Sequence, residues 1–106
     1  MIDYKISISD YKIYLINLRS SVFKILPLYE DGNKFLDQYI CDVIKEVVKF
    51  KEVSNHMPST KEIDWYIKII LTLEVIKDEV KTEKHSQIKK KVLFITNKIQ
   101  KELEAI

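Results

Sequence analysis

The side chains best suited to catalysis in this 106-residue chain are one cysteine and two histidines. Cys41 could act as a nucleophile if folding brought His56 or His85 beside it, because a histidine base favours the reactive thiolate. However, a lone cysteine within an apolar helical stretch is more often a small buried side chain. We therefore expect no catalytic residue, and with a single cysteine an internal disulfide is excluded.

The spacings that a metal or phosphate site needs are also missing. Zinc sites typically combine close pairs of cysteine or histidine ligands, and neither Cys-x-x-Cys nor His-x-x-x-His occurs here. Asp37 and Cys41 would share a helix face, but two ligands do not make a site. Gly32 is the only glycine, so a glycine-rich phosphate loop cannot form. The sequence predicts no enzyme, no bound metal and no cofactor.

Basic side chains gather in the last quarter of the chain. Those that could contact nucleic-acid phosphates are Lys84, Lys89, Lys90, Lys91 and Lys98. Such a run is also typical of a solvated helix face, and Phe94 is the only aromatic residue among these lysines that could stack on a base. With 18 Lys and Arg against 16 Asp and Glu, the net charge of +2 creates no strong field. Nucleic acid is therefore the less favoured partner.

Apolar residues recur every three or four positions through most of the chain, which is the spacing of one helix face. A first helix should begin near Ser7 to Asp10 and end at Pro27, because proline lacks an amide donor and disfavours a helical residue before it. The segment Asp31 to Asn33 then supplies a turn, with Asn33 as the cap of a second helix that begins at about Lys34 and runs to Phe50.

A third helix is predicted after Pro58, where Ser59 and Glu62 match a capping box. Its apolar residues fall on two sides. One face holds Ile63, Tyr66, Ile67, Ile70 and Leu73, and the roughly opposite face holds Trp65, Ile69 and Ile76. The same letters also fit an alternating strand, but the chain lacks the glycine turns that hairpins usually need, so we favour a helix.

The fourth helix has the clearest pattern, with Ile88, Val92, Ile95, Ile99 and Leu103 on one face and an end at Ile106. No proline or glycine separates it from the third helix, so one continuous rod is an alternative. The alternation from Ile2 to Ile8 predicts a short extended arm at the N-terminus. Together these patterns predict an all-α fold, an antiparallel bundle of about four helices in a single domain over residues 1–106.

Membrane and export signals are missing from the sequence. No stretch approaches the roughly eighteen uncharged apolar residues of a membrane span. The first residues contain no basic region followed by an apolar core, as a signal peptide would. We therefore expect no membrane span and a cytoplasmic location.

An excess of apolar helix surface favours a protein partner. A helix that is apolar on two sides is either central in its bundle or partly covered by another subunit, and a homodimer would cover it. The aromatic and apolar residues predicted at such an interface are Leu28, Tyr29, Met57, Trp65, Ile69 and Ile76. The sequence leaves open whether Leu28 and Tyr29, beside Pro27, are buried or exposed.

Three segments together, Leu18 to Glu30, Phe35 to Phe50 and Ile88 to Ile99, resemble small helical proteins of low-GC Gram-positive bacteria and their phages. In size and four-helix layout the chain is also similar to the immunity proteins that protect producers of pediocin-like bacteriocins. Neither resemblance supplies a site residue. Together with the apolar helix surface, they favour a non-enzymatic binding protein of phage or mobile-element type: an inhibitor, an immunity factor or an assembly subunit.

Overall fold

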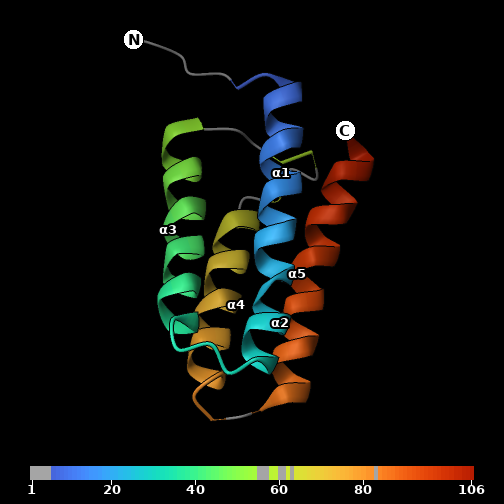
Figure 1. Cartoon of the computed structure of the whole chain (residues 1–106). Coiled ribbons are helices and arrows are strands. Elements are labelled where there is room, and N and C mark those ends of the chain that lie inside the picture. The colour runs from blue at the N-terminus through green and yellow to red at the C-terminus, as the bar shows by residue number, and fades with distance from the viewer. Residues whose placement is uncertain (1–5, 55–57, 60–61, 63, 83) are drawn as a thin grey trace.

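The computed structural model describes residues 6–54, 58–59, 62, 64–82 and 84–106. In these residues the regular structure is entirely helical, which confirms the all-α prediction (Figure 1). The helices are α1 (Ile8–Phe23), α2 (Ile25–Glu30), α3 (Leu36–Ser54), α4 (Trp65–Glu79) and α5 (His85–Ala105). The third and fourth predicted helices are separate elements, α4 and α5, rather than one rod.

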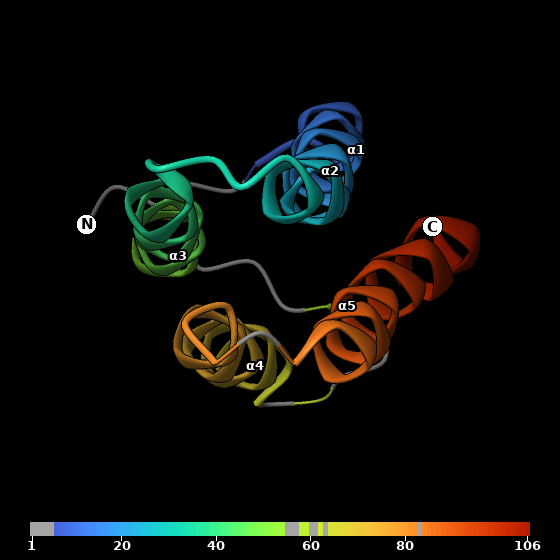
Figure 2. The ribbon, with the colours of Figure 1, turned by 60° about the horizontal axis from the view of Figure 1, so that its bottom comes forward.

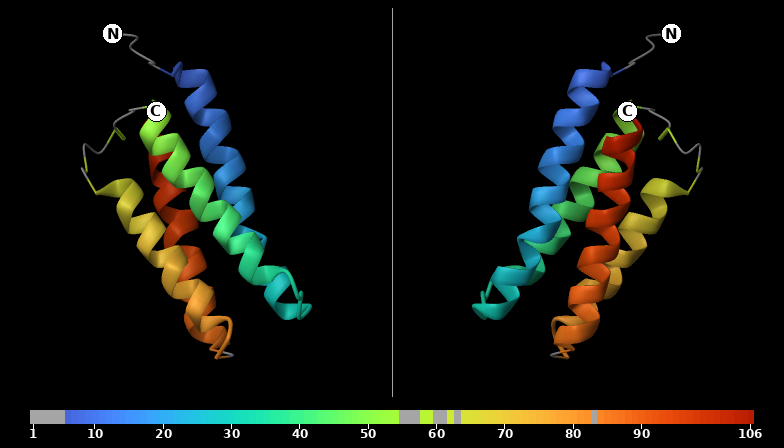
Figure 3. Two further views of the ribbon diagram at one scale, coloured as in Figure 1. Left: turned by 90° about the vertical axis from the view of Figure 1, so that its left-hand side faces the viewer. Right: turned by 90° about the vertical axis from the view of Figure 1, so that its right-hand side faces the viewer.

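The helices form an antiparallel bundle of four rods, because α2 extends the line of α1 (Figures 1 and 2). Around the bundle, α1 packs against α5, α5 against α4, and α4 against α3. Figure 3 shows the same arrangement from two sides. As a result α1 and α4 lie diagonally opposite each other, and α4 is covered on two flanks by α3 and α5.

The N-terminus of α1 follows the predicted capping chemistry. Ser7 adopts an extended backbone, and its hydroxyl accepts a hydrogen bond of 3.1 Å from the amide of Asp10. Residues 2–5 of the predicted extended arm lie outside the described residues, and Ile8 is already helical. The arm prediction is therefore wrong at Ile8.

The sequence had predicted that the first helix ends at Pro27. Pro27 instead lies inside α2, and Leu26 before it is helical and buried. Proline cannot donate to the carbonyl four residues earlier, here that of Phe23, and its ring crowds that carbonyl. The break therefore falls one turn earlier, at Lys24. In the first turn of α2 the missing amide costs nothing, since amides there have no partner within the helix.

The turn between α2 and α3 matches its predicted chemistry. The amide of Asn33 donates to the carbonyl of Leu28 at 3.0 Å, and that of Gly32 donates to the carbonyl of Tyr29 at 3.1 Å. This pair of bonds is a Schellman motif, which needs a left-handed residue, and Gly32 supplies it with φ +66°. The side chain of Asn33 accepts from the amide of Phe35 at 2.8 Å, which closes a turn just before α3, and α3 begins at Leu36, two residues after the predicted start at Lys34.

The two-sided apolar pattern of α4 resolves into one buried face and one exposed face. The residues of α4 that pack into the core are Trp65, Tyr66, Ile69, Leu73 and Ile76. Ile67, which the sequence analysis had grouped with Tyr66 and Leu73, is 42% exposed instead. The face was misplaced because both sides of this helix are apolar, and only the positions of α3 and α5 decide which side is covered.

Candidate functional site

Three of the predicted interface residues are interior residues. Trp65, Ile69 and Ile76 are 1%, 0% and 0% exposed, because α3 and α5 cover the face of α4 that carries them. Their prediction as free surface is wrong. Leu28 and Tyr29 are half-buried and pack against the core, and Met57 lies outside the described residues.

The free apolar surface of α4 lies on its other side. Ile67, Leu71 and Val75 are 42%, 59% and 43% exposed. Each lies four positions after the one before, so they form a line of about 12 Å along the helix. We call these three residues the α4 stripe. Apolar side chains gathered on one exposed face are more informative than scattered ones, because such faces often mark contacts with other molecules.

Ion pairs hold α4 at both ends. Lys98 on α5 contacts Glu62, just before α4, with 2.9 Å between Nζ and Oε2, and its Nζ lies 5.9 Å from the centre of the Trp65 ring. Lys91 contacts Glu79 at the other end, with 2.7 Å between Nζ and Oε1. These two lysines therefore fix α5 to the α4 region, and the predicted capping role of Glu62 is replaced by this pairing.

The predicted phosphate-contacting lysines do not share one face. Lys91 and Lys98 point toward the α4 side, as their ion pairs require. Lys89 and Lys90 are exposed, and consecutive helix residues point about 100° apart around the axis. Lys84 precedes the helix and is exposed as well. The five predicted lysines therefore do not form a single stripe of positive charge.

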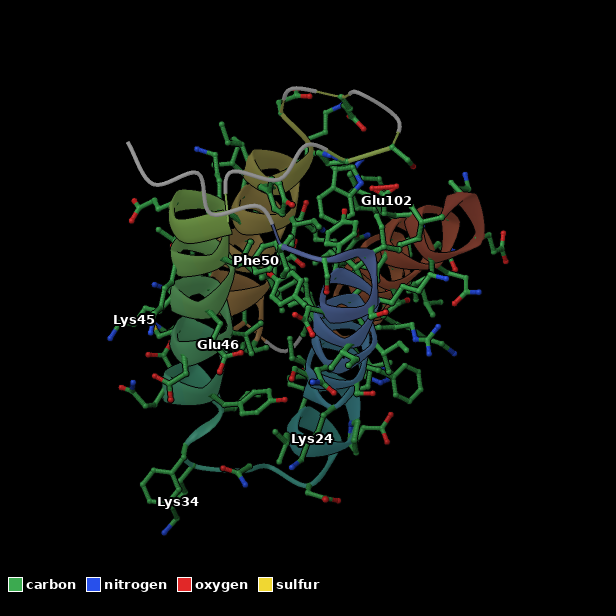
Figure 4. The ribbon with its side chains drawn as sticks, turned by 90° about the horizontal axis from the view of Figure 1, so that it is seen from above. Lys24, Lys34, Lys45, Glu46, Phe50 and Glu102 are labelled. Atoms are coloured by element: carbon green, nitrogen blue, oxygen red, sulfur yellow. The ribbon has the colours of Figure 1, made fainter. Side chains whose placement is uncertain are left out.

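The polar group that sequence analysis missed is Glu102 of α5, which is fully buried. Its Oε2 accepts hydrogen bonds from the Tyr11 hydroxyl and from the Ser59 amide, both at 2.8 Å. The Ser59 hydroxyl donates to the other carboxylate oxygen, Oε1. Ser59 therefore anchors the connection before α4 to α5 instead of capping α4. Figure 4, a view from above, shows Glu102 beside α5.

Aromatic side chains surround this network and fill the space between α1 and α3. The rings of Tyr14 and Phe50 are stacked with centres 3.6 Å apart, and Phe50 also contacts Tyr66 with centres 6.0 Å apart. Figure 4 shows Phe50 reaching from α3 toward α1. The α1–α3 contact therefore depends on large rings rather than on close approach of the two backbones.

Burial keeps the tyrosine hydroxyls of the network protonated. Burial and the hydrogen bond to Glu102 raise the pKa of Tyr11 far above its ordinary value. Burial also raises the pKa of Tyr66 to about 12, with a further contribution from the nearby Glu102 charge. A neutral phenol donates a hydrogen bond, so the Tyr11 hydroxyl stabilises the Glu102 carboxylate. Glu102 itself has no exposed surface, so the network lies inside the bundle.

The fold does not bring the thiol of Cys41 beside the imidazole of His85. His85 lies at the start of α5, with Nε2 3.4 Å from Oε1 of Glu30, and its ring stacks on that of Tyr29. Cys41 lies half-buried on α3 near Lys77, and no contact joins it to His85 in the described part of the chain. His56 is outside that part. The described residues also contain no cluster of three or more metal-ligand side chains.

Comparison with protein-family models, with curated proteins and with solved structures finds no match to this chain. Among the residues that the structure describes, no helix is both long and apolar enough to cross a membrane. Function must therefore be inferred from the surfaces and side chains themselves.

Proposed function

We propose that this is a non-enzymatic binding protein and that the α4 stripe is the surface that contacts its protein partner. The observation that carries the proposal is the exposure of Ile67, Leu71 and Val75 on one line of a helix whose opposite face is buried. An apolar ridge at this spacing fits the groove of another helical protein. Covering it removes apolar surface from water, which favours association.

The contacts that hold α4 in place support the same proposal. The helix is held by α3 and α5 on its flanks and by the ion pairs of Glu62 and Glu79 near its ends. A surface on a rigid element loses little conformational entropy when it binds, so more of the contact energy appears as affinity. An inhibitor, an immunity factor or an assembly subunit would act through such a preformed surface, and so would a homodimer.

The competing functions have weaker support. A nucleic-acid contact needs a concentrated basic face, whereas Lys91 and Lys98 are engaged by acidic residues beside α4. An enzyme needs a reactive group that a substrate can reach, and the buried carboxylate of Glu102 has no exposed surface. Both observations favour binding over catalysis.

Leu71→Glu tests the proposal directly. Leu71 is 59% exposed, so this variant should keep its helical circular dichroism and its unfolding temperature. Phe35→Glu is the matched control, because Phe35 is 77% exposed in the turn before α3 and far along the chain from the stripe. Complexes would be detected by light scattering and by a photo-crosslinking residue at position 67 in cells that produce the protein.

We expect the parent and Phe35→Glu to form the same crosslinked complex, with another protein or with a second copy. Leu71→Glu should lose it, because a carboxylate would replace the most exposed side chain of the stripe. A complex that survives Leu71→Glu unchanged, or a parent that forms none, would contradict the proposal.

A further inference from the structure

A second apolar surface lies where α1 and α2 meet α5. It is a groove of about 440 Å³, a volume in the range of ligand pockets. We call it the α1/α5 groove, and its lining residues are Arg19, Ser20, Phe23, Lys24, Pro27 and Thr96. The groove exists because small side chains, Ser20 and Thr96, lie between larger ones. Phe23 is 53% exposed beside them.

An exposed apolar residue of α1, Ile16, extends the groove toward the N-terminal end of that helix. On the first rod, Ile16, Ser20, Phe23 and Pro27 follow one another at helical spacing, and Ile16 is 43% exposed. On α5, the hydroxyl of Thr96 donates to a carbonyl of its own helix at 3.1 Å, so its polar group is satisfied without a partner molecule. The groove is therefore lined mainly by apolar surface rather than by polar groups that need a partner.

The charged residues that line the groove, Arg19 and Lys24, are both positive. Arg19 donates to the side-chain oxygen of Gln100, a neutral amide, and Lys24 forms no ion pair in the described part of the chain. No acidic residue is among the lining residues. The charge beside the α4 stripe is already compensated, because the neighbouring Lys68 is paired with Glu62. The groove therefore offers two uncompensated cations beside apolar surface.

We infer that the α1/α5 groove binds an amphipathic helix with acidic flanks from a partner protein. A groove between two packed helices accepts the side-chain ridge of a third helix. The cations at Arg19 and Lys24 would face the acidic flanks, and this complementarity would orient the helix and exclude basic ones. The site is independent of the α4 stripe, because α1 and α4 are diagonal in the bundle.

A synthetic peptide provides the probe. A labelled, end-capped peptide of about four helical turns would carry leucines at i, i+3, i+4 and i+7 and glutamates elsewhere. Its controls are a scrambled peptide of the same composition and a peptide with lysines in place of the glutamates. Fluorescence anisotropy should show the acidic amphipathic peptide binding about tenfold more tightly than either control. Equal binding of the acidic and the lysine peptide would overturn the inference.

Paired variants locate the binding. Ser20→Trp fills the groove, whereas Asn17→Trp places the same bulk at an exposed position of α1 that does not line the groove, and only the former should abolish peptide binding. Lys24→Glu should weaken binding about tenfold, and Lys45→Glu, with the same change of net charge, should not. Figure 4 shows Lys24 on the rod of α1 and α2 and Lys45 on the far side of α3.

Three results would overturn the groove assignment. One is equal loss of binding in Ser20→Trp and Asn17→Trp, and another is equal loss in Lys24→Glu and Lys45→Glu. The third is a concentration-dependent dimer that only Ser20→Trp disrupts, which would mean that a second copy occupies the groove. Leu71→Glu separates the two surfaces, because it should remove the complex proposed for the α4 stripe and leave peptide binding unchanged.

Discussion

Glu102 shows how a single charged residue can be accommodated in a small apolar interior. A carboxylate transferred from water to the core is costly unless hydrogen bonds replace its hydration. Here the donors are the Tyr11 hydroxyl and the amide and hydroxyl of Ser59. The raised pKa of Tyr11, caused first by burial, keeps that phenol in its donating form. Glu102 therefore joins α1, α5 and the connection before α4.

Glu102→Gln should destabilise the protein by about 1–3 kcal/mol, the usual cost of leaving a buried polar group without its partner. The amide keeps one acceptor oxygen but replaces the other with a donor, which would face Tyr11 or Ser59. Urea denaturation followed by circular dichroism measures the loss. Glu104→Gln is the control, since Glu104 lies two residues further along α5 and is exposed. Equal denaturation midpoints for the two variants would show that the network carries no stability.

At the scale of the helices, the sequence predicted the existence of each long helix and the turn at Gly32, because both depend on local spacing and backbone chemistry. It did not predict the orientation of α4, since Trp65 and Ile67 are both apolar and point about 200° apart. That choice depends on α3 and α5. The burial of Glu102 did leave a signal, because it follows Ile95 and Ile99 by seven and three residues on the same apolar face.

Two aspartate substitutions distinguish the faces that the structure assigns. Ile95 is fully buried on α5, so Ile95→Asp should unfold the domain by placing an unpaired charge in the core. Ile67 is 42% exposed, so Ile67→Asp should change the free energy of unfolding by only about 0.5 kcal/mol. Thermal unfolding monitored by circular dichroism measures both. If Ile67→Asp also unfolds the protein, the buried face of α4 has been assigned wrongly.

In the whole molecule, a polar bond connects two helices that lie diagonally opposite each other, and aromatic rings fill the space between neighbouring helices. α1 and α4 are diagonal, yet Tyr11 and Tyr66 share a side-chain hydrogen bond beside Glu102. Phe50 of α3 contacts both Tyr14 and Tyr66. The two proposed binding surfaces lie outside this interior, on α4 and between α1 and α5. Substitutions there should therefore alter binding without loosening the bundle.

The tyrosines make a prediction about the whole bundle at alkaline pH. Burial raises the pKa of Tyr66 from 10.0 to about 12, so its protonated form favours the folded state. Its contribution to stability is complete below pH 10, where the phenol is protonated in both states, and is lost as the pH rises through about 12. Urea denaturation at increasing pH should therefore show a falling free energy of unfolding above pH 10, with phenolate absorbance from the buried tyrosines appearing as the helices melt. Tyr66→Phe should be less sensitive to pH over this interval. An identical pH dependence in the parent and in Tyr66→Phe would mean that this hydroxyl is equally accessible in the folded and unfolded chains.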